Sequence, residues 1–198
     1  MVFKAIRKNA GKVLIGLIMS GSMLGASSGA TAAGYTLDPT HSFVEFRIQH
    51  LGYSWLYGRF NTVKGNFLHD ANKPMNNKVN IIIDTASIDS NHAERDKHLR
   101  GKDFLNVKRF PEASFKATGY SGTADKGVLT GKLTLHGVTK TIDIEVTKVG
   151  EGKDPWGGYR AGFSGTVVLK LADYGMTYNL GPASTTVEMR LGIEGIRY

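Results

Sequence analysis

Apolar and polar residues alternate along several short stretches of the chain. A period of two puts successive side chains on opposite faces of a strand, so one face is apolar and the other faces water. The same period recurs at 44–48 and 142–146. It is clearest near the C-terminus, where Val187, Met189, Leu191 and Ile193 alternate with Glu188, Arg190, Gly192 and Glu194.

Glycines and prolines separate these β-branched and aromatic runs, as they do between strands. Eight strands are predicted, near 35–50, 56–68, 78–86, 112–121, 127–136, 141–149, 160–172 and 184–197. With almost no helix to cover a sheet, they must close on themselves or pack as a sandwich. A barrel of about eight strands has an interior that side chains fill or that holds one small ligand. The pattern alone leaves barrel and sandwich open.

One short helix is predicted, at 91–100. Asn91 suits the N-cap, Glu94 lies in the first turn, basic residues occupy the last turn, and Gly101 follows. The helix covers the stretch NHAERDKHL at 91–99, which holds two histidines and two carboxylates. The question is whether these residues form a site or a polar helix face.

On a helix, His92 would lie beside Asp96 and Glu94 beside His98, because residues four apart share a face. The two pairs point away from each other, and a zinc site needs three or four converging ligands. The spacing also differs from H-E-x-x-H. We therefore expect an exposed helix with local ion pairs, and neither a metal site nor a catalytic site.

The other histidines, His41, His50, His69 and His136, are scattered singly, and a lone histidine near a strand end is usually a satisfied hydrogen-bonding group. The predicted domain at 33–198 contains no G-x-S-x-G elbow, no phosphate loop and no G-x-G-x-x-G before a helix. This favours a binding protein over an enzyme, although an enzyme built from scattered residues stays open.

The N-terminus has the pattern of a secretory signal peptide. Basic residues precede an apolar run at 13–24, and an A-x-A sequence ends at Ala32. The run is shorter than the roughly 20 apolar residues that span a bilayer, so no stable membrane anchor is expected. We predict a signal peptide at 1–32, one domain at 33–198 and a periplasmic location.

Composition narrows the function further. The leader holds four basic and no acidic residues, so its removal lowers the net charge from +8 to +4. No block of lysine and arginine remains, and nucleic-acid binding is not expected. There is no cysteine, which excludes disulfides, thiolate metal sites and a cysteine nucleophile.

Aromatic side chains are frequent after the leader. They either pack an ordinary core or line a cavity for an apolar ligand, and composition leaves both open. The phenylalanines concerned are Phe43, Phe46, Phe60, Phe67, Phe104, Phe110, Phe115 and Phe163.

Several motifs resemble the YceI-like periplasmic lipid-binding proteins, and they run in order through the predicted domain. They are HSFVEFRIQHLGYSWLYGRF at 41–60, NHAERDKHL at 91–99, DFLNVKRFP at 103–111, GKLTLHGVTK at 131–140, DPWGGYRAGF at 154–163 and DYGMTYNLGPAS at 173–184. The resemblance implies an eight-stranded antiparallel lipocalin-like barrel. It also implies a hydrophobic tunnel for a polyisoprenoid chain, such as a prenyl phosphate or a ubiquinone-type molecule.

The chain departs from the family at one position. Many members carry an arginine two residues before the aspartate of a D-F-G motif, whereas this chain has Leu171 before Asp173, Tyr174 and Gly175. If that arginine binds a ligand head group elsewhere in the family, a neutral or quinone head suits this chain better than a phosphate.

We therefore expect a monomeric or weakly dimeric, all-β periplasmic protein that holds a long isoprenoid lipid as a carrier, store or sensor, without a cofactor. The alternatives are an envelope hydrolase or metal-dependent enzyme, and a ligand-free stress-protective barrel. The residues predicted to contact lipid are Val44, Phe46, Ile48, Phe60, Ile81, Ile83, Phe115, Leu133, Leu135, Phe163, Val167, Leu169, Val187, Met189 and Leu191.

Overall fold

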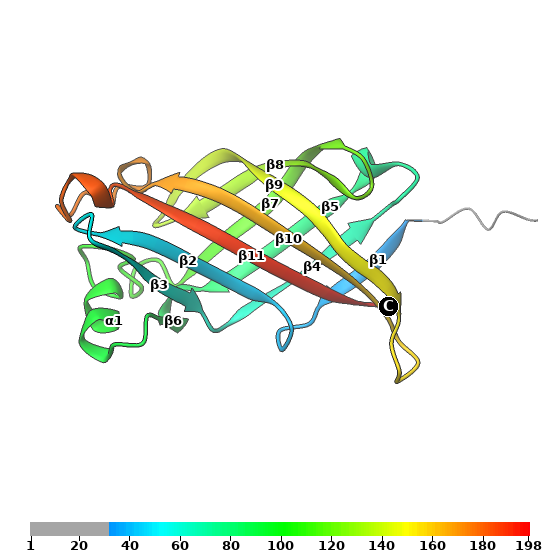
Figure 1. Cartoon of the computed structure of the whole chain (residues 1–198), viewed down its shortest axis with the longest axis horizontal. Coiled ribbons are helices and arrows are strands. Elements are labelled where there is room, and N and C mark those ends of the chain that lie inside the picture. The colour runs from blue at the N-terminus through cyan, green and yellow to red at the C-terminus, as the bar shows by residue number, and fades with distance from the viewer. Residues whose placement is uncertain (1–31) are drawn as a thin grey trace, which may run out of the picture.

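The computed structural model describes residues 32–198 as one antiparallel β-sheet with a single short α-helix (Figure 1). The predicted leader lies outside the described residues except for Ala32 and stays a prediction. No helix within 32–198 is long and apolar enough to cross a membrane. The strands are β1 (Ala33–Leu37), β2 (Phe43–His50), β3 (Ser54–Phe60), β4 (Val63–His69), β5 (Lys78–Asp84), β6 (Ile88–Asp89), β7 (Glu112–Gly122), β8 (Lys126–Leu135), β9 (Val138–Lys153), β10 (Tyr159–Lys170) and β11 (Thr186–Arg197).

The eight predicted segments are all strands, and the first two are each interrupted once. The segment near 35–50 divides into β1 and β2, and that near 56–68 into β3 and β4. Short 3-10 turns complete the structure: η1 (Pro74–Asn76), η2 (Thr85–Ser87), η3 (Leu171–Tyr174) and η4 (Pro182–Ser184).

The sheet closes into a barrel because β11 pairs with both ends of the first segment. Tyr35 on β1 is the register partner of Arg197, and Phe46 on β2 is the partner of Met189. Eight strands form the ring, in the order β1, β4, β5, β7, β8, β9, β10 and β11, while β2, β3 and β6 extend the sheet beyond it. This confirms an eight-stranded antiparallel barrel and excludes the sandwich.

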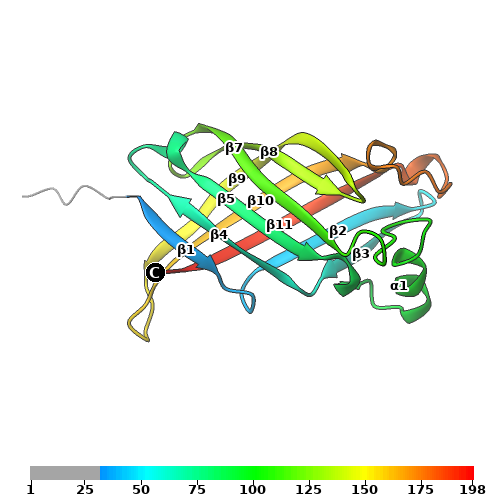
Figure 2. The same ribbon diagram turned by 180° about the vertical axis from the view of Figure 1, so that it is seen from behind.

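The barrel is elongated, with different elements at its two ends. The helix α1 (Ala93–Leu99), the β2–β3 turn and the segment from η3 to η4 gather at one end (Figure 1). The C-terminus and the β9–β10 hairpin lie at the other, and the view from behind shows the same division (Figure 2).

The helix is shorter than predicted, and its contacts differ. The N-cap is His92, whose Nδ1 accepts a hydrogen bond from the Arg95 N–H, and not Asn91. Asp96 is buried and accepts hydrogen bonds from the backbone N–H and hydroxyl of Ser90, so it is not paired with His92.

The second predicted pair is also wrong. His98 lies 2.9 Å from Asp103, and Glu94 lies 3.6 Å from Lys97. The spacing rule describes the helix alone, whereas the turns on either side of α1 supply nearer partners for Asp96 and His98.

Two β-bulges break the alternation of inward and outward side chains. In the pairing of β7 with β8, the register shifts between Ala117 and Gly119; in the pairing of β10 with β9, it shifts at Gly162 and Phe163. A bulge inserts one extra residue and re-aims the side chains beyond it. The extra residue on β9 is Val149, which is 76% exposed. Lys148 is therefore the register partner of Phe163 and Glu151 that of Ala161, which puts Lys148 and Glu151 on the same face of β9.

Aromatic rings lie directly over glycines inside the barrel. A Cβ atom on Gly58 would overlap the ring of Phe46, and one on Gly131 would overlap the ring of Phe115. Gly58 is the register partner of Phe46 on the neighbouring strand. The absence of a side chain at these positions lets large rings lie close to the wall, so space remains along the barrel axis.

Candidate functional site

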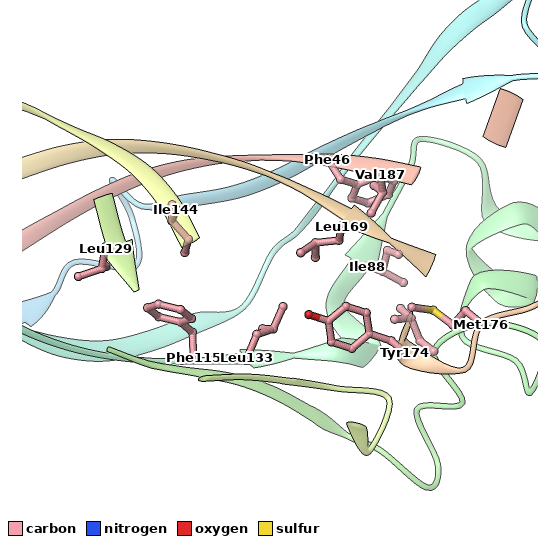
Figure 3. Close-up of a cluster of buried hydrophobic side chains, with 11 residues drawn as sticks. Phe46, Ile88, Phe115, Leu129, Leu133, Ile144, Leu169, Tyr174, Met176 and Val187 are labelled. Atoms are coloured by element: carbon pink, nitrogen blue, oxygen red, sulfur yellow. The ribbon is translucent and has the colours of Figure 1, made fainter. Parts of the chain in front are cut away.

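A long apolar cavity of about 730 Å³ runs through the barrel. Its wall is built from the inward faces of the strands, where every second residue is mostly leucine, isoleucine, valine or phenylalanine. Figure 3 shows side chains such as Phe115, Ile144 and Leu169 pointing from different strands into this interior. The barrel is therefore not filled by its own side chains.

All fifteen residues predicted to contact lipid lie on the cavity wall. They come from β2, β3, β5, β7, β8, β10 and β11, and no bulge turns any of them outward. That these side chains contact a lipid stays a prediction.

The aromatic residues divide between wall and exterior. Six of the eight phenylalanines noted in the sequence line the cavity, and two do not. Phe43 is 44% exposed on the outer face, and Phe110 packs against His136 at a ring distance of 4.7 Å. Leu171, the residue at which the sequence departs from the pattern of the resemblance, also lines the cavity.

We call the cavity end beside α1 the helix end, and define its polar wall as His50, Arg95, His98 and Asn179. Arg95 donates to the Ser90 hydroxyl, and His98 pairs with Asp103. His50, His98 and Asn179 are exposed, so the polar groups here are either paired or in contact with water.

We call the opposite end the His69 end, and define its polar wall as His69, Asp125 and Lys148. His69 closes β4, where it shares the inward face with Val63 and Phe67. Lys148 continues the inward series of Ile144 and Val146 on β9. Both residues have the inward position in the alternation of their strands, but the prediction of lipid contacts covered only apolar side chains.

His69 is buried without a hydrogen-bond partner. It is 5% exposed, and neither ring nitrogen is bonded to any group in the described part of the chain. The ring packs edge-on against Phe163 at 5.2 Å. The expectation that the lone histidines are satisfied hydrogen-bonding groups is therefore wrong for His69.

Burial lowers the pKa of His69, because desolvation disfavours the charged imidazolium and outweighs the attraction of the Glu151 carboxylate. Nε2 lies 3.5 Å from Glu151 Oε2, without the geometry of a hydrogen bond. The neutral imidazole therefore forms no ion pair with this carboxylate.

Lys148 is charged and already paired. Its ammonium lies 2.8 Å from Asp125 and 3.9 Å from Glu151. The hydrogen bond to Asp125 raises the pKa of Lys148. Two carboxylates therefore surround one ammonium at this end, and the bulge at Val149 is what brings Glu151 to the same side as Lys148.

One group of metal-ligand residue types converges among residues 32–198, and none of its members lines the cavity. Asp38, His41 and Glu194 place ligand atoms within 4.8 Å of one another. Arg160 already binds the two carboxylates, donating to Asp38 at 2.7 Å and to Glu194 at 2.6 Å. The cluster joins β10, β11 and the β1–β2 connection as an ion-pair network.

The fold and the cavity define a class, the closed antiparallel barrels that surround a long apolar interior. Within that class the chain belongs to the YceI-like domain family, whose model matches residues 35–195. A UPF0312 protein of Pseudomonas aeruginosa is 52% identical over 188 residues, covering 94% of this chain and 98% of the relative. A UPF0312 protein of Yersinia enterocolitica is also 52% identical over 188 residues, covering 94% and 97%.

Solved structures share the fold. The YCEI protein of Campylobacter jejuni superposes with a TM-score of 0.68 at 26% identity, covering 76% of this chain and 90% of that one. BcnA of Burkholderia cenocepacia gives a TM-score of 0.71 at 21% identity, covering 80% and 98%. A structure described as a polyisoprenoid binding domain from Saccharophagus degradans gives 0.62 at 20% identity, covering 85% and 100%.

Proposed function

We propose that the protein is a periplasmic binding protein that encloses one long isoprenoid or comparable lipid, as a carrier, store or sensor. The observation that carries this proposal is the apolar cavity of about 730 Å³ along the barrel. Sites for small molecules are typically clefts of about 300–1,000 Å³, lined mainly by apolar side chains with a few polar groups. The cavity fits this description, with its polar groups confined to the two ends.

The apolar wall is sufficient to hold such a ligand. Burial contributes about 0.8 kcal/mol per methylene, so each five-carbon isoprene unit adds roughly 4 kcal/mol. A micromolar complex needs about 8 kcal/mol net, and ordering a flexible chain subtracts from the gain. Several enclosed isoprene units therefore give useful affinity without a metal or a charged anchor.

Two comparisons bear on this proposal. The chain belongs to the YceI-like family, and a structure with the same fold is described as a polyisoprenoid binding domain. That likeness, at 20% identity, bears on the fold, so the isoprenoid ligand of this chain rests on the cavity itself.

The two rival functions differ from binding in what the cavity should contain. A purely structural barrel would fill its interior, whereas this interior holds a cavity of about 730 Å³. An enzyme would bring catalytic groups together within the cavity. The three-residue cluster of Asp38, His41 and Glu194 lies outside its wall, and Lys148 and Asp125 at the His69 end are paired with each other. We infer binding without chemistry on the ligand.

Native mass spectrometry of protein purified from the periplasmic fraction tests this proposal. We expect a mature chain beginning at Ala33 or Gly34, with a mass increment of one lipid that disappears after extraction with organic solvent. The increment also identifies the lipid. Protein that carries no lipid and takes none up from a prenyl lipid extract would contradict the binding function, and intact Met1 in the membrane pellet would contradict export.

A further inference from the structure

Three side chains in the described part of the molecule have buried polar atoms without a hydrogen-bond partner: His69, His136 and Tyr174. Only His69 also lines the cavity. His136 keeps one bond, from its Nδ1 to the Tyr174 carbonyl oxygen at 2.8 Å, whereas both ring nitrogens of His69 are unpaired. Among the described residues, His69 is therefore the one cavity-lining side chain whose buried polar atoms lack a hydrogen bond.

The protein groups around His69 leave both of its ring nitrogens without a hydrogen bond. Phe163 covers the ring edge-on, and Phe67 packs edge-on against Phe163 at 5.6 Å. The nearest carboxylate, Glu151, lies 3.5 Å from Nε2 without hydrogen-bond geometry, and Asp70 accepts from the backbone N–H groups of Asn72 and Lys73. Since leaving a buried polar group unpaired is costly, a polar group of a ligand in the cavity would gain by bonding this ring.

The charges at the His69 end select the kind of group. Lys148 is the cation on this stretch of wall, and Asp125 and Glu151 already surround it. A phosphate would add negative charge beside two carboxylates, and its Coulomb interaction with the set would be repulsive overall. A neutral imidazole can donate one hydrogen bond and accept another, which matches a hydroxyl, a phenol or a quinone carbonyl.

We propose that the His69 end binds the head group of the enclosed lipid and that this head is an uncharged oxygen group rather than a phosphate. The proposal rests on the proposed function, because it assumes an apolar chain in the cavity. His69 bonds the oxygen, and the chain extends past Phe163 and Ile144 toward the helix end, where the polar groups are paired or exposed. The lipid therefore binds in one orientation, with its head at the His69 end and its apolar chain toward the helix end.

The test is a competition between ligands that share a chain and differ only in the head. Delipidated protein is mixed with equal amounts of geranylgeraniol and the hydrocarbon in which hydrogen replaces the hydroxyl, and the bound ratio is read by native mass spectrometry. A second mixture pairs geranylgeraniol with its monophosphate. We expect the wild type to prefer the alcohol over the hydrocarbon by about threefold to tenfold, the value of one net hydrogen bond, and over the phosphate as well.

Variants then assign the preference to His69. His69→Phe keeps an aromatic ring beside Phe163 but removes both nitrogens, so the preference for the alcohol should be lost and the hydrocarbon should bind at least as well as the alcohol. His69→Gln keeps a donor and an acceptor and should retain most of the preference. His41→Phe, a histidine outside the cavity wall, is the matched control and should behave as the wild type. His69→Leu removes the same nitrogens and replaces His69→Phe if that variant does not fold.

The outcomes separate this inference from the proposed function. If the wild type binds neither the alcohol nor the hydrocarbon, the lipid-binding function itself fails. If it binds both equally, or if His69→Phe or His69→Leu retains the full preference, the cavity stands and the head-group site is wrong. If the phosphate displaces the alcohol, the assignment of an uncharged head is wrong.

Discussion

Asp38 shows how a single buried carboxylate joins the ends of three strands. Its side chain is 8% exposed and accepts hydrogen bonds from the Thr40 hydroxyl at 2.6 Å and from Arg160 at 2.7 Å. Arg160 also donates to Asp154 at 2.9 Å and to Glu194. The guanidinium thus holds the β1–β2 connection against β10 and β11, next to the closure of the barrel.

The hydrogen bond from Thr40 is the main cause that holds the pKa of Asp38 well below its usual range, and His41 and Arg160 add to it. A carboxyl whose pKa is lower in the folded state than in the unfolded state stabilises the fold above its ordinary pKa. That stability is lost as the pH falls from the ordinary value, about 3.9, toward the lowered folded value.

We therefore expect Thr40→Val to reduce the free energy of unfolding by about 0.5–1.5 kcal/mol at pH 7, the value of one hydrogen bond. The difference from the wild type should persist between pH 7 and pH 3, because the lowered pKa keeps Asp38 ionised in the folded protein over this range. Urea unfolding at several pH values in this range measures it, with the exposed Thr166→Val on β10 as the control. A difference that disappears within this range would show that Asp38 is protonated there and that its pKa is not held down.

Among the secondary-structure elements, α1 is held against the barrel by side chains that hydrogen-bond to residues 86–90, directly before the helix. Asp96 accepts from Ser90, Arg95 donates to the Ser90 carbonyl, and Arg100 donates to the carbonyls of Ala86 and Ile88. A helix of seven residues has little stability by itself, so these contacts decide its position.

Asp96→Ala should reduce the free energy of unfolding by about 2–3 kcal/mol, because it leaves the buried N–H and hydroxyl of Ser90 without an acceptor. Glu94→Ala on the same helix should change it by less than about 0.5 kcal/mol, since Glu94 and its partner Lys97 are both highly exposed. Chemical denaturation of the two variants gives the comparison. Equal losses would mean that the helix is held by its propensity and not by Asp96.

For the whole molecule, the barrel separates an inner wall from an outer surface on every strand. Val167 on β10 lines the cavity opposite Met189, whereas the next residue, Val168, is 61% exposed and pairs with Glu188 on the outside. These neighbours provide a matched test of whether the interior is ligand space or a packed core.

Val167→Trp should weaken the binding of a fluorescent prenyl analogue at least about tenfold, because the indole occupies the space that the lipid needs. The delipidated barrel should lose less than the roughly 1–3 kcal/mol that overpacking costs in a filled core. Val168→Trp should leave both binding and stability near the wild type. Thermal unfolding of delipidated protein and analogue titration are the two measurements. If Val167→Trp unfolds the barrel yet the folded fraction binds fully, the cavity is not the lipid site.

The local sequence determined where the strands lie and which side chains point inward, because successive residues on a strand point to opposite faces. The alternation of Val187, Met189 and Leu191 is the same in the sequence and in the wall of β11. Barrel closure was not readable from that pattern, since a sandwich hides the same faces; it came from the resemblance, and the pairing of β1 with β11 confirms it.

Tertiary structure decided whatever depends on which strands meet. The partners of Asp96 and His98 come from neighbouring turns, and the bulge at Val149 turns Glu151 toward Lys148 against the simple alternation. His69 has the right parity in the sequence, but only the packing of Phe163 and the pairing of Lys148 leave its ring without a partner. Parity is a property of one strand, whereas the size of the cavity and an unsatisfied group on its wall are properties of the closed barrel.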